Sequence, residues 1–231
     1  MGQKKLIRFE EIKTFPNVLQ YPPGMPGRWN EFFKNQNPLI LELACGKGEY
    51  TIGLSEKNAG ANYIGIDQKG NRIWVGAKKA LEKNLGNAAF LRIQIDHITD
   101  YFSTHEVSEI WITFPDPQLR FSKAKKRLTH PKFLRLYARV LQPGGLIHLK
   151  TDSPDLYKFT KTVIEMYCCL LIVDIPDIYS VKVIPDELNI KTYYESLDIA
   201  QSKQVYYLCF SLPGIFPGKE KEEELKRRIK E

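Results

Sequence analysis

The sequence has few cysteines and no spacing of them that suggests a structural role. Its 231 residues include four cysteines and four histidines, and no Cys-x-x-Cys pair occurs. Disulfide-rich secreted domains and zinc sites both depend on characteristic cysteine spacings. We therefore expect neither a disulfide framework nor a metal site, and a reducing cytoplasm suits this cysteine content.

Long apolar runs are also missing. No stretch approaches the roughly 18 uninterrupted apolar residues that a membrane-spanning helix needs, and the chain begins with charged residues rather than an apolar signal segment. With 43% apolar and 26% charged residues, the composition is that of a compact globular protein. We expect a cytoplasmic protein that does not enter the membrane.

Acidic residues are absent from one segment, residues 117–151. Nine basic residues lie in it: Arg120, Lys123, Lys125, Lys126, Arg127, Lys132, Arg135, Arg139 and Lys150. The formal net charge of the chain is +7, and the remainder holds 25 basic against 27 acidic residues. Such a concentration favours a surface that grips a polyanion at one place. The alternative is a solvated helix face, although such faces usually mix both signs.

Strand-like and helix-like patterns alternate along the chain. Buried strands are expected at 38–43, 63–66, 89–95, 110–114 and 146–150, with the clearest helices at 70–85 and 131–141. This order predicts an α/β fold of Rossmann-like type, with a mostly parallel central sheet and helices on both faces. Ligands of such folds bind at the carboxyl ends of the strands.

The ends of the chain are less regular. Residues 1–37 contain several prolines and glycines, so we expect an extended N-terminal arm with at most a short helix. Residues 38–218 are expected to form one domain, with an irregular insert at 176–203. The charged tail, 219–231, is expected to be a solvated helix or a frayed end.

A glycine turn follows the first predicted strand. Gly46 and Gly48 would let the backbone approach a ligand closely, and Asp67 ends the next strand, where a carboxylate can accept hydrogen bonds from ribose hydroxyls. A nicotinamide dinucleotide would need a third small residue where this chain has Thr51. S-adenosylmethionine suits the pattern better, because Glu42 can reach its positive methionine end. The alternative role for Glu42 is to accept backbone N–H bonds at the strand end.

Three further acids follow predicted strands. Asp96 can accept from an adenine amino group, or can cap a helix. Asp116 is held between two prolines in Phe114-Pro-Asp-Pro117, which aims a rigid carboxylate at a substrate. Asp152 returns a second acid to the same rim, or caps the next helix through Ser153.

These motifs resemble, in order and spacing, those of the bacterial tRNA (guanine-N7)-methyltransferases, over residues 38–195. The shared motifs are Glu42-Leu-Ala-Cys-Gly-Lys-Gly48, Asp67, Phe114-Pro-Asp-Pro117 with the basic run after it, Leu141-Gln-Pro-Gly-Gly145, Thr151-Asp152 and Thr192-Tyr-Tyr-Glu195. The resemblance implies a class I methyltransferase that transfers a methyl group from S-adenosylmethionine to N7 of the variable-loop guanosine, position 46, of tRNA.

The resemblance also implies roles for individual residues. Contacts to S-adenosylmethionine are expected from Glu42, Asp67, Asp96 and Asp116, together with the turn glycines Gly46 and Gly48. Asp116 is in addition the expected catalytic residue. Substrate contacts are expected from Arg120, Asp152, Thr192, Tyr193, Tyr194 and Glu195. Lys123, Lys125, Lys126 and Arg127 are expected to contact the tRNA backbone.

The chain departs from the family pattern at two places. The family usually continues Pro-Asp-Pro with Trp-Pro-Lys-Lys-Arg-His, whereas here Gln118-Leu-Arg120 follows, and the first family glycine is Ala44. Three other functions stay open: methylation of another RNA or a small molecule, RNA binding without catalysis, and, disfavoured by the glycine pattern, a nicotinamide oxidoreductase. A monomer and a homodimer are both compatible with the sequence.

Overall fold

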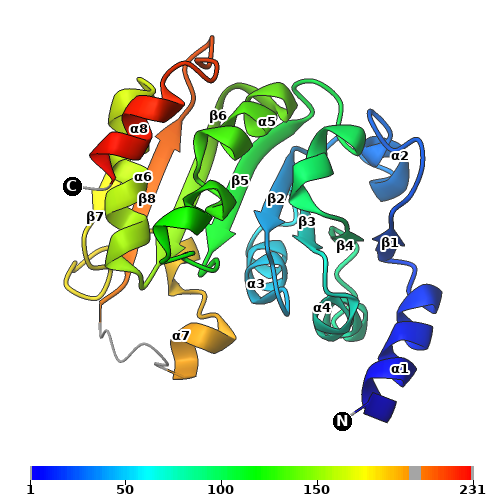
Figure 1. Cartoon of the computed structure of the whole chain (residues 1–231). Coiled ribbons are helices and arrows are strands. Elements are labelled where there is room, and N and C mark those ends of the chain that lie inside the picture. The colour runs from blue at the N-terminus through cyan, green and yellow to red at the C-terminus, as the bar shows by residue number, and fades with distance from the viewer. Residues whose placement is uncertain (1, 198–203, 230–231) are drawn as a thin grey trace.

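The computed structural model describes residues 2–197 and 204–229. Eight strands of these described residues form one sheet in the order β1-β4-β3-β2-β5-β6-β8-β7 (Figure 1). Their bounds are β1 Val18–Gln20, β2 Leu39–Leu43, β3 Asn62–Asp67, β4 Ala88–Arg92, β5 Val107–Thr113, β6 Leu141–Thr151, β7 Leu170–Ile175 and β8 Tyr206–Ser211. Neighbouring strands from β1 to β6 are parallel, and β8 runs antiparallel to both β6 and β7. The predicted mostly parallel sheet is confirmed.

Helices pack against both faces of the sheet, as predicted. Their bounds are α1 Gly2–Glu11, α2 Trp29–Phe33, α3 Glu49–Lys57, α4 Gly70–Glu82, α5 Pro131–Val140, α6 Pro154–Met166, α7 Tyr193–Leu197 and α8 Glu222–Arg228. Short 3-10 helices are η1 Ile12–Thr14, η2 Ile95–Asp100, η3 Phe121–Lys126 and η4 Asp186–Asn189. Apolar residues of α2, α5, α6 and α8 join the core on one face. Those of α3, α4 and the segment between β7 and β8 pack on the other.

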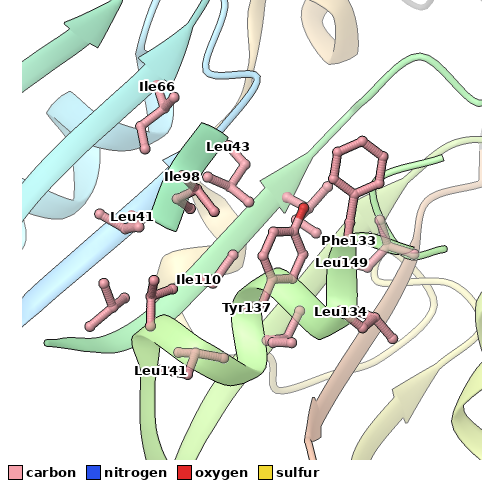
Figure 2. Close-up of a cluster of buried hydrophobic side chains, with 14 of the residues drawn as sticks. Leu41, Leu43, Ile66, Ile98, Ile110, Phe133, Leu134, Tyr137, Leu141 and Leu149 are labelled. Atoms are coloured by element: carbon pink, nitrogen blue, oxygen red, sulfur yellow. The ribbon is translucent and has the colours of Figure 1, made fainter. Parts of the chain in front are cut away.

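The larger core cluster shows the period-2 alternation of the strands. Leu41 and Leu43 of β2 are fully buried in the same cluster as Phe133 and Tyr137 of α5 (Figure 2). Glu42 lies between them on β2, so its side chain points to the opposite face of the sheet. That face is the one covered by α3. The alternation therefore sets the direction of a predicted site residue.

Several strand boundaries differ from the prediction, and β5, for example, begins at Val107 rather than at residue 110. β4 ends at Arg92 rather than at residue 95, because Ile95 already belongs to η2. β6 begins at Leu141 rather than at residue 146, and Leu141 pairs with Val107 before a shift in register. Gly144 has a φ of +77° there, so the backbone bends locally without ending the strand.

The N-terminal segment is more ordered than the expected extended arm. It contains a ten-residue helix, α1, and a strand, β1, that adds to the sheet beside β4. Ile12 is 1% exposed, the Asn17 side chain donates to the Ala77 carbonyl, and the Trp29 indole donates to the Tyr101 carbonyl. The prolines separate these elements, and the apolar side chains between them anchor the segment to the domain.

The predicted insert and tail are described only in part. The insert holds η4 and α7, and its residues 198–203 lie outside the described residues, as do residues 230–231 of the tail. The tail forms α8, as one of its two expected states, but Leu225 is 1% exposed and packs in the core. In the described part of the chain no helix is long and apolar enough to cross a membrane.

Strand β2 lies inside the parallel part of the sheet, between β3 and β5. The chain moves outward from β2 to β3 and β4 on one side, and then to β5 and β6 on the other. The carboxyl ends of β2 and β5 therefore border the topological switch point, where open α/β sheets bind their ligands.

Candidate functional site

A cavity of about 900 Å³ lies at the switch point. Predicted site residues on its lining are Glu42, Gly46, Asp67, Asp96, Asp116, Lys125, Lys126, Asp152, Thr192, Tyr193 and Tyr194. The lining as described does not include Gly48, Arg120, Lys123, Arg127 or Glu195. The structure thus brings the predicted cofactor acids and most predicted substrate residues into one hollow.

Glu42 is a buried carboxyl group at the end of β2, with the residue 4% exposed. It accepts hydrogen bonds from the Thr51 backbone N–H at 2.7 Å, the Thr51 hydroxyl at 2.5 Å and the Thr113 hydroxyl at 3.0 Å. Burial raises the pKa of Glu42 to about 7, although these hydrogen bonds act in the opposite direction. Glu42 therefore makes the backbone contact considered above and also lines the cavity.

Asp67 ends β3 and is 7% exposed. Its carboxylate accepts from the Gly46 N–H at 3.1 Å and from the Lys69 N–H at 2.8 Å. Each carboxylate oxygen can accept two hydrogen bonds, so both oxygens keep capacity for hydroxyl donors. These contacts tie the glycine turn to the end of the neighbouring strand.

The two turn glycines have different environments. Both have positive φ, +57° at Gly46 and +72° at Gly48. A Cβ at Gly46 would meet no atom within 4 Å, whereas one at Gly48 would stand 2.4 Å from the Phe90 ring. Gly46 thus leaves open space beside the cavity. Glycine is needed at position 48 because the Phe90 ring occupies the space that a side chain would need. Ala44, where the family has glycine, also has a φ of +57°.

Gly48→Ala is expected to lower the free energy of unfolding by about 2–4 kcal/mol, from left-handed backbone strain plus overpacking against Phe90. Gly46→Ala, the matched control, should cost only the strain, about 1–2 kcal/mol. Urea unfolding of both variants measures the difference. Equal losses would contradict the assignment of Gly48 to packing.

Asp96 lies in the first turn of η2, whose N-cap is Gln94, so Asp96 is not the cap. Its carboxylate forms an ion pair with Lys132 of α5, and both residues line the cavity. Lys132 belongs to the acid-free segment. In the folded protein its charge is nevertheless paired, with an acid that lies 36 residues away in the sequence.

The loop after β5 presents Asp116 at the surface of the cavity. Phe114 and Gln118 have φ of +45° and +48°, and the Asp116 carboxylate accepts from the Gln118 N–H at 3.0 Å. Arg127 holds this loop in place. Its guanidinium donates to the Pro117 and Gln118 carbonyls and lies 4.5 Å from the centre of the Phe159 ring. Arg127 is 7% exposed, so it supports the loop rather than facing a polyanion.

Several other charges of the acid-free segment are paired in space. Arg135 contacts Glu222 of α8, and Lys150 is fully buried beside Glu195. Lys125 lies 3.8 Å from Glu222 but its side chain is 60% exposed. The basic residues of this segment that are exposed near the cavity are therefore fewer than the sequence indicates: Arg120, Lys123, Lys125 and Lys126, on or beside η3, and Lys132, which pairs with Asp96.

Asp152 follows β6 and lines the cavity. The cap of α6 is Ser153, whose hydroxyl accepts from the Leu156 N–H at 3.2 Å. The structure therefore assigns the capping role to Ser153, and Asp152 stands on the cavity wall together with Asp116.

Thr192 to Glu195 form a capping box at the start of α7. The Thr192 hydroxyl accepts from the Glu195 N–H at 3.2 Å, and the Glu195 carboxylate accepts from the Thr192 N–H at 3.3 Å. Between them, Tyr193 and Tyr194 face the cavity, and the Lys47 ammonium lies 3.2 Å from the centre of the Tyr193 ring.

Sequence reasoning missed Lys47, Lys132 and Lys150 as parts of this arrangement. The capping box was visible as Thr-x-x-Glu, and it would have indicated that Glu195 faces its own helix start. No local pattern reveals the partners of the three lysines, because each contact joins distant segments.

Comparison with known proteins places the chain in a family. Residues 36–208 match the family described as "Putative methyltransferase". A tRNA (guanine-N(7)-)-methyltransferase of Porphyromonas gingivalis is 46% identical over 213 residues, which cover 87% of this chain and 86% of that protein. Another, from Christiangramia forsetii, is 45% identical over 92% of this chain and 100% of its own length.

Solved structures show the same fold at low identity. The 16S rRNA methyltransferase KamB has a TM-score of 0.60 at 15% identity and covers 80% of this chain and 93% of its own. A geranyl diphosphate C-methyltransferase of Streptomyces coelicolor, in complex with S-adenosyl-L-homocysteine, has a TM-score of 0.53 at 12% identity, over 89% and 76% of the two chains. These neighbours support the fold alone, because one is named for a ribosomal RNA and the other for a small molecule. The relatives found by sequence share one name and are 45–46% identical to most of this chain. The chain therefore belongs to the tRNA (guanine-N(7)-)-methyltransferase family.

Proposed function

We propose that this chain transfers the methyl group of S-adenosylmethionine to N7 of the variable-loop guanosine, position 46, of tRNA. The observation that carries the proposal is one cavity whose lining combines strand-end carboxylates, an open glycine turn, Asp116, Asp152 and two tyrosines. Exposed lysines of η3 border it. The names of the relatives agree with this activity.

The residues present fit S-adenosylmethionine. Asp67 keeps acceptor capacity for ribose hydroxyls, and the backbone at Gly46 leaves open space where a side chain would otherwise stand. We assign Glu42 to the methionine end, Asp67 to the ribose and Asp96 to the adenine amino group. When bound, this cofactor supplies an electrophilic methyl group on a positively charged sulfur.

Guanine N7 has a lone pair and no proton at neutral pH, so the chain needs no general base to remove one. Positioning of the two reactants should therefore dominate the catalysis. The purine becomes cationic on methylation, and a preorganised carboxylate stabilises this developing charge. We assign this role to Asp116, with Asp152 accepting hydrogen bonds from the guanine N1–H and amino groups beside it.

The tRNA backbone is assigned to exposed residues around η3. Lys123, Lys125 and Lys126 are suited to phosphate contacts, which position a nucleic acid without reading its sequence. Arg120 lies outside the cavity lining and is exposed, so we assign it to a phosphate rather than to guanine O6. In this proposal residues 38–218 form the methyltransferase domain.

Affinity for S-adenosylmethionine should depend on pH through Glu42. Above the pKa of about 7 the carboxylate is ionised and attracts the cationic methionine end, and below it the neutral acid does not. The dissociation constant should therefore rise about tenfold from pH 8 to pH 6. Equilibrium dialysis of wild type and Glu42→Gln at both pH values measures this, and the variant corrects for titration of the cofactor itself. The same pH dependence in both proteins would contradict the assignment.

The proposed reaction is tested with radiolabelled S-adenosylmethionine and two unmodified tRNA transcripts, which carry guanosine or adenosine at the variable-loop position. Label should enter only the guanosine transcript, and aniline treatment should cleave it at that nucleotide. Equal labelling of both transcripts would place the target elsewhere. No labelling despite cofactor binding would refute tRNA as the substrate, and no cofactor binding would favour an RNA-binding protein without catalysis.

A further inference from the structure

Lys150 is a fully buried lysine that the proposed reaction does not use. It lies near the end of β6, two residues before Asp152, and its side chain is 0% exposed. An unpaired buried ammonium is costly, but this one donates to the Leu188 carbonyl at 2.9 Å, the Ile190 carbonyl at 3.1 Å and the Glu195 carboxylate at 2.9 Å. All three acceptors belong to the segment between β7 and β8.

That segment has little regular structure to hold its shape. In its described residues, 176–197 and 204–205, it forms only η4, of four residues, and α7, of five. Helices this short are not stable by themselves, so tertiary contacts must fix their position. Lys150 provides a fixed point, because it stands on a central strand of the sheet.

The Glu195 carboxylate accepts hydrogen bonds from three residues. Besides Lys150, its carboxylate accepts from the Thr192 N–H and from the Tyr179 hydroxyl at 2.5 Å. Its side chain is only 3% exposed. These contacts leave Glu195 turned into the protein, while Tyr193 and Tyr194, each 45% exposed, line the cavity.

We propose that Lys150 and Glu195 are positioning residues, which hold Tyr193 and Tyr194 on the cavity wall as the stacking surface for the target base. The inference rests on the proposed function and replaces the expected direct contact of Glu195 with substrate. Unstacked RNA bases are commonly recognised by stacking on aromatic side chains. The cation–π contact between Lys47 and Tyr193 joins the same surface to the glycine turn.

The test is a double-mutant cycle on methylation of the guanosine transcript, with Lys150→Met, Tyr193→Ala and the double variant. Each single variant should raise the KM for tRNA about tenfold, with the dissociation constant of S-adenosylmethionine within about twofold of wild type. The KM of the double variant should be no higher than that of the worse single variant. Once Lys150→Met has displaced the tyrosines, removing the Tyr193 ring takes away no further stacking contact with the base. Losses that multiply, or an unchanged KM in Lys150→Met, would overturn the proposal.

Two further variants keep the test decisive. Lys161→Met removes the lysine of a 2.6 Å pair with Asp174 at the surface of α6 and should leave KM unchanged. If Lys150→Met does not fold, Glu195→Gln takes its place in the cycle, since it removes the charge while preserving the shape. Failure of the proposed function would appear differently, as a wild-type protein that does not methylate the guanosine transcript.

Discussion

Asp116→Ala is expected to lower kcat for tRNA methylation by about 10² to 10³, the effect of removing one preorganised group that stabilises transition-state charge. The dissociation constant for tRNA should stay within about twofold of wild type, because the proposed phosphate contacts lie on or beside η3 and not at Asp116. Single-turnover methylation and filter binding separate the two quantities.

Asp116→Asn is the matched control for shape. The amide retains an oxygen that can accept from the Gln118 N–H, as the carboxylate does at 3.0 Å, but it carries no negative charge. We expect its kcat to fall nearly as far as that of the alanine variant. A weakening of tRNA binding equal to the loss in turnover would show that Asp116 acts in binding instead.

Charge reversal at Lys125 and Lys126 should have the opposite effect. The double variant, with glutamate at both positions, should bind tRNA at least tenfold more weakly, and the slope of log K against log salt should become shallower by about two. At saturating tRNA its kcat should remain close to that of wild type. The affinity for S-adenosylmethionine should be unchanged.

The control replaces Lys78 and Lys79 of α4 with glutamate. Both are exposed, lie away from η3 in the sequence and change the net charge by the same amount. If the two double variants weaken tRNA binding equally, the net charge of the protein, and not the surface beside the cavity, controls affinity.

The strand ends were predictable because the signals that define them are local. Leu39–Leu43 is apolar at every position except Glu42 and is followed by a glycine turn, and the structure places β2 there. Acids that follow such runs must lie at the carboxyl edge of a parallel sheet. Glu42, Asp67, Asp116 and Asp152 therefore share one cavity, as their positions in the sequence indicated.

The direction of individual side chains was less predictable. Gly48 was expected beside a ligand, but the structure packs it against Phe90 of β4. Arg127 was expected on a phosphate, but burial under the Phe114 to Gln118 loop uses its donors for two carbonyls. In both cases the deciding neighbour comes from another element of the fold.

The sequence by itself determined the family, the order of strands and helices, and the edge of the sheet that carries the site. These features depend on periodicity and on motifs within a few residues. The tertiary structure alone decided which charges face outward. Arg135 and Glu222 are 87 residues apart, Lys150 and Glu195 are 45 apart, and both pairs form because folding brings acids from distant segments to a run of sequence that contains none. Burial then makes such pairing necessary, since an uncompensated charge in the interior is costly. The basic residues left at the surface are the ones that we propose for tRNA.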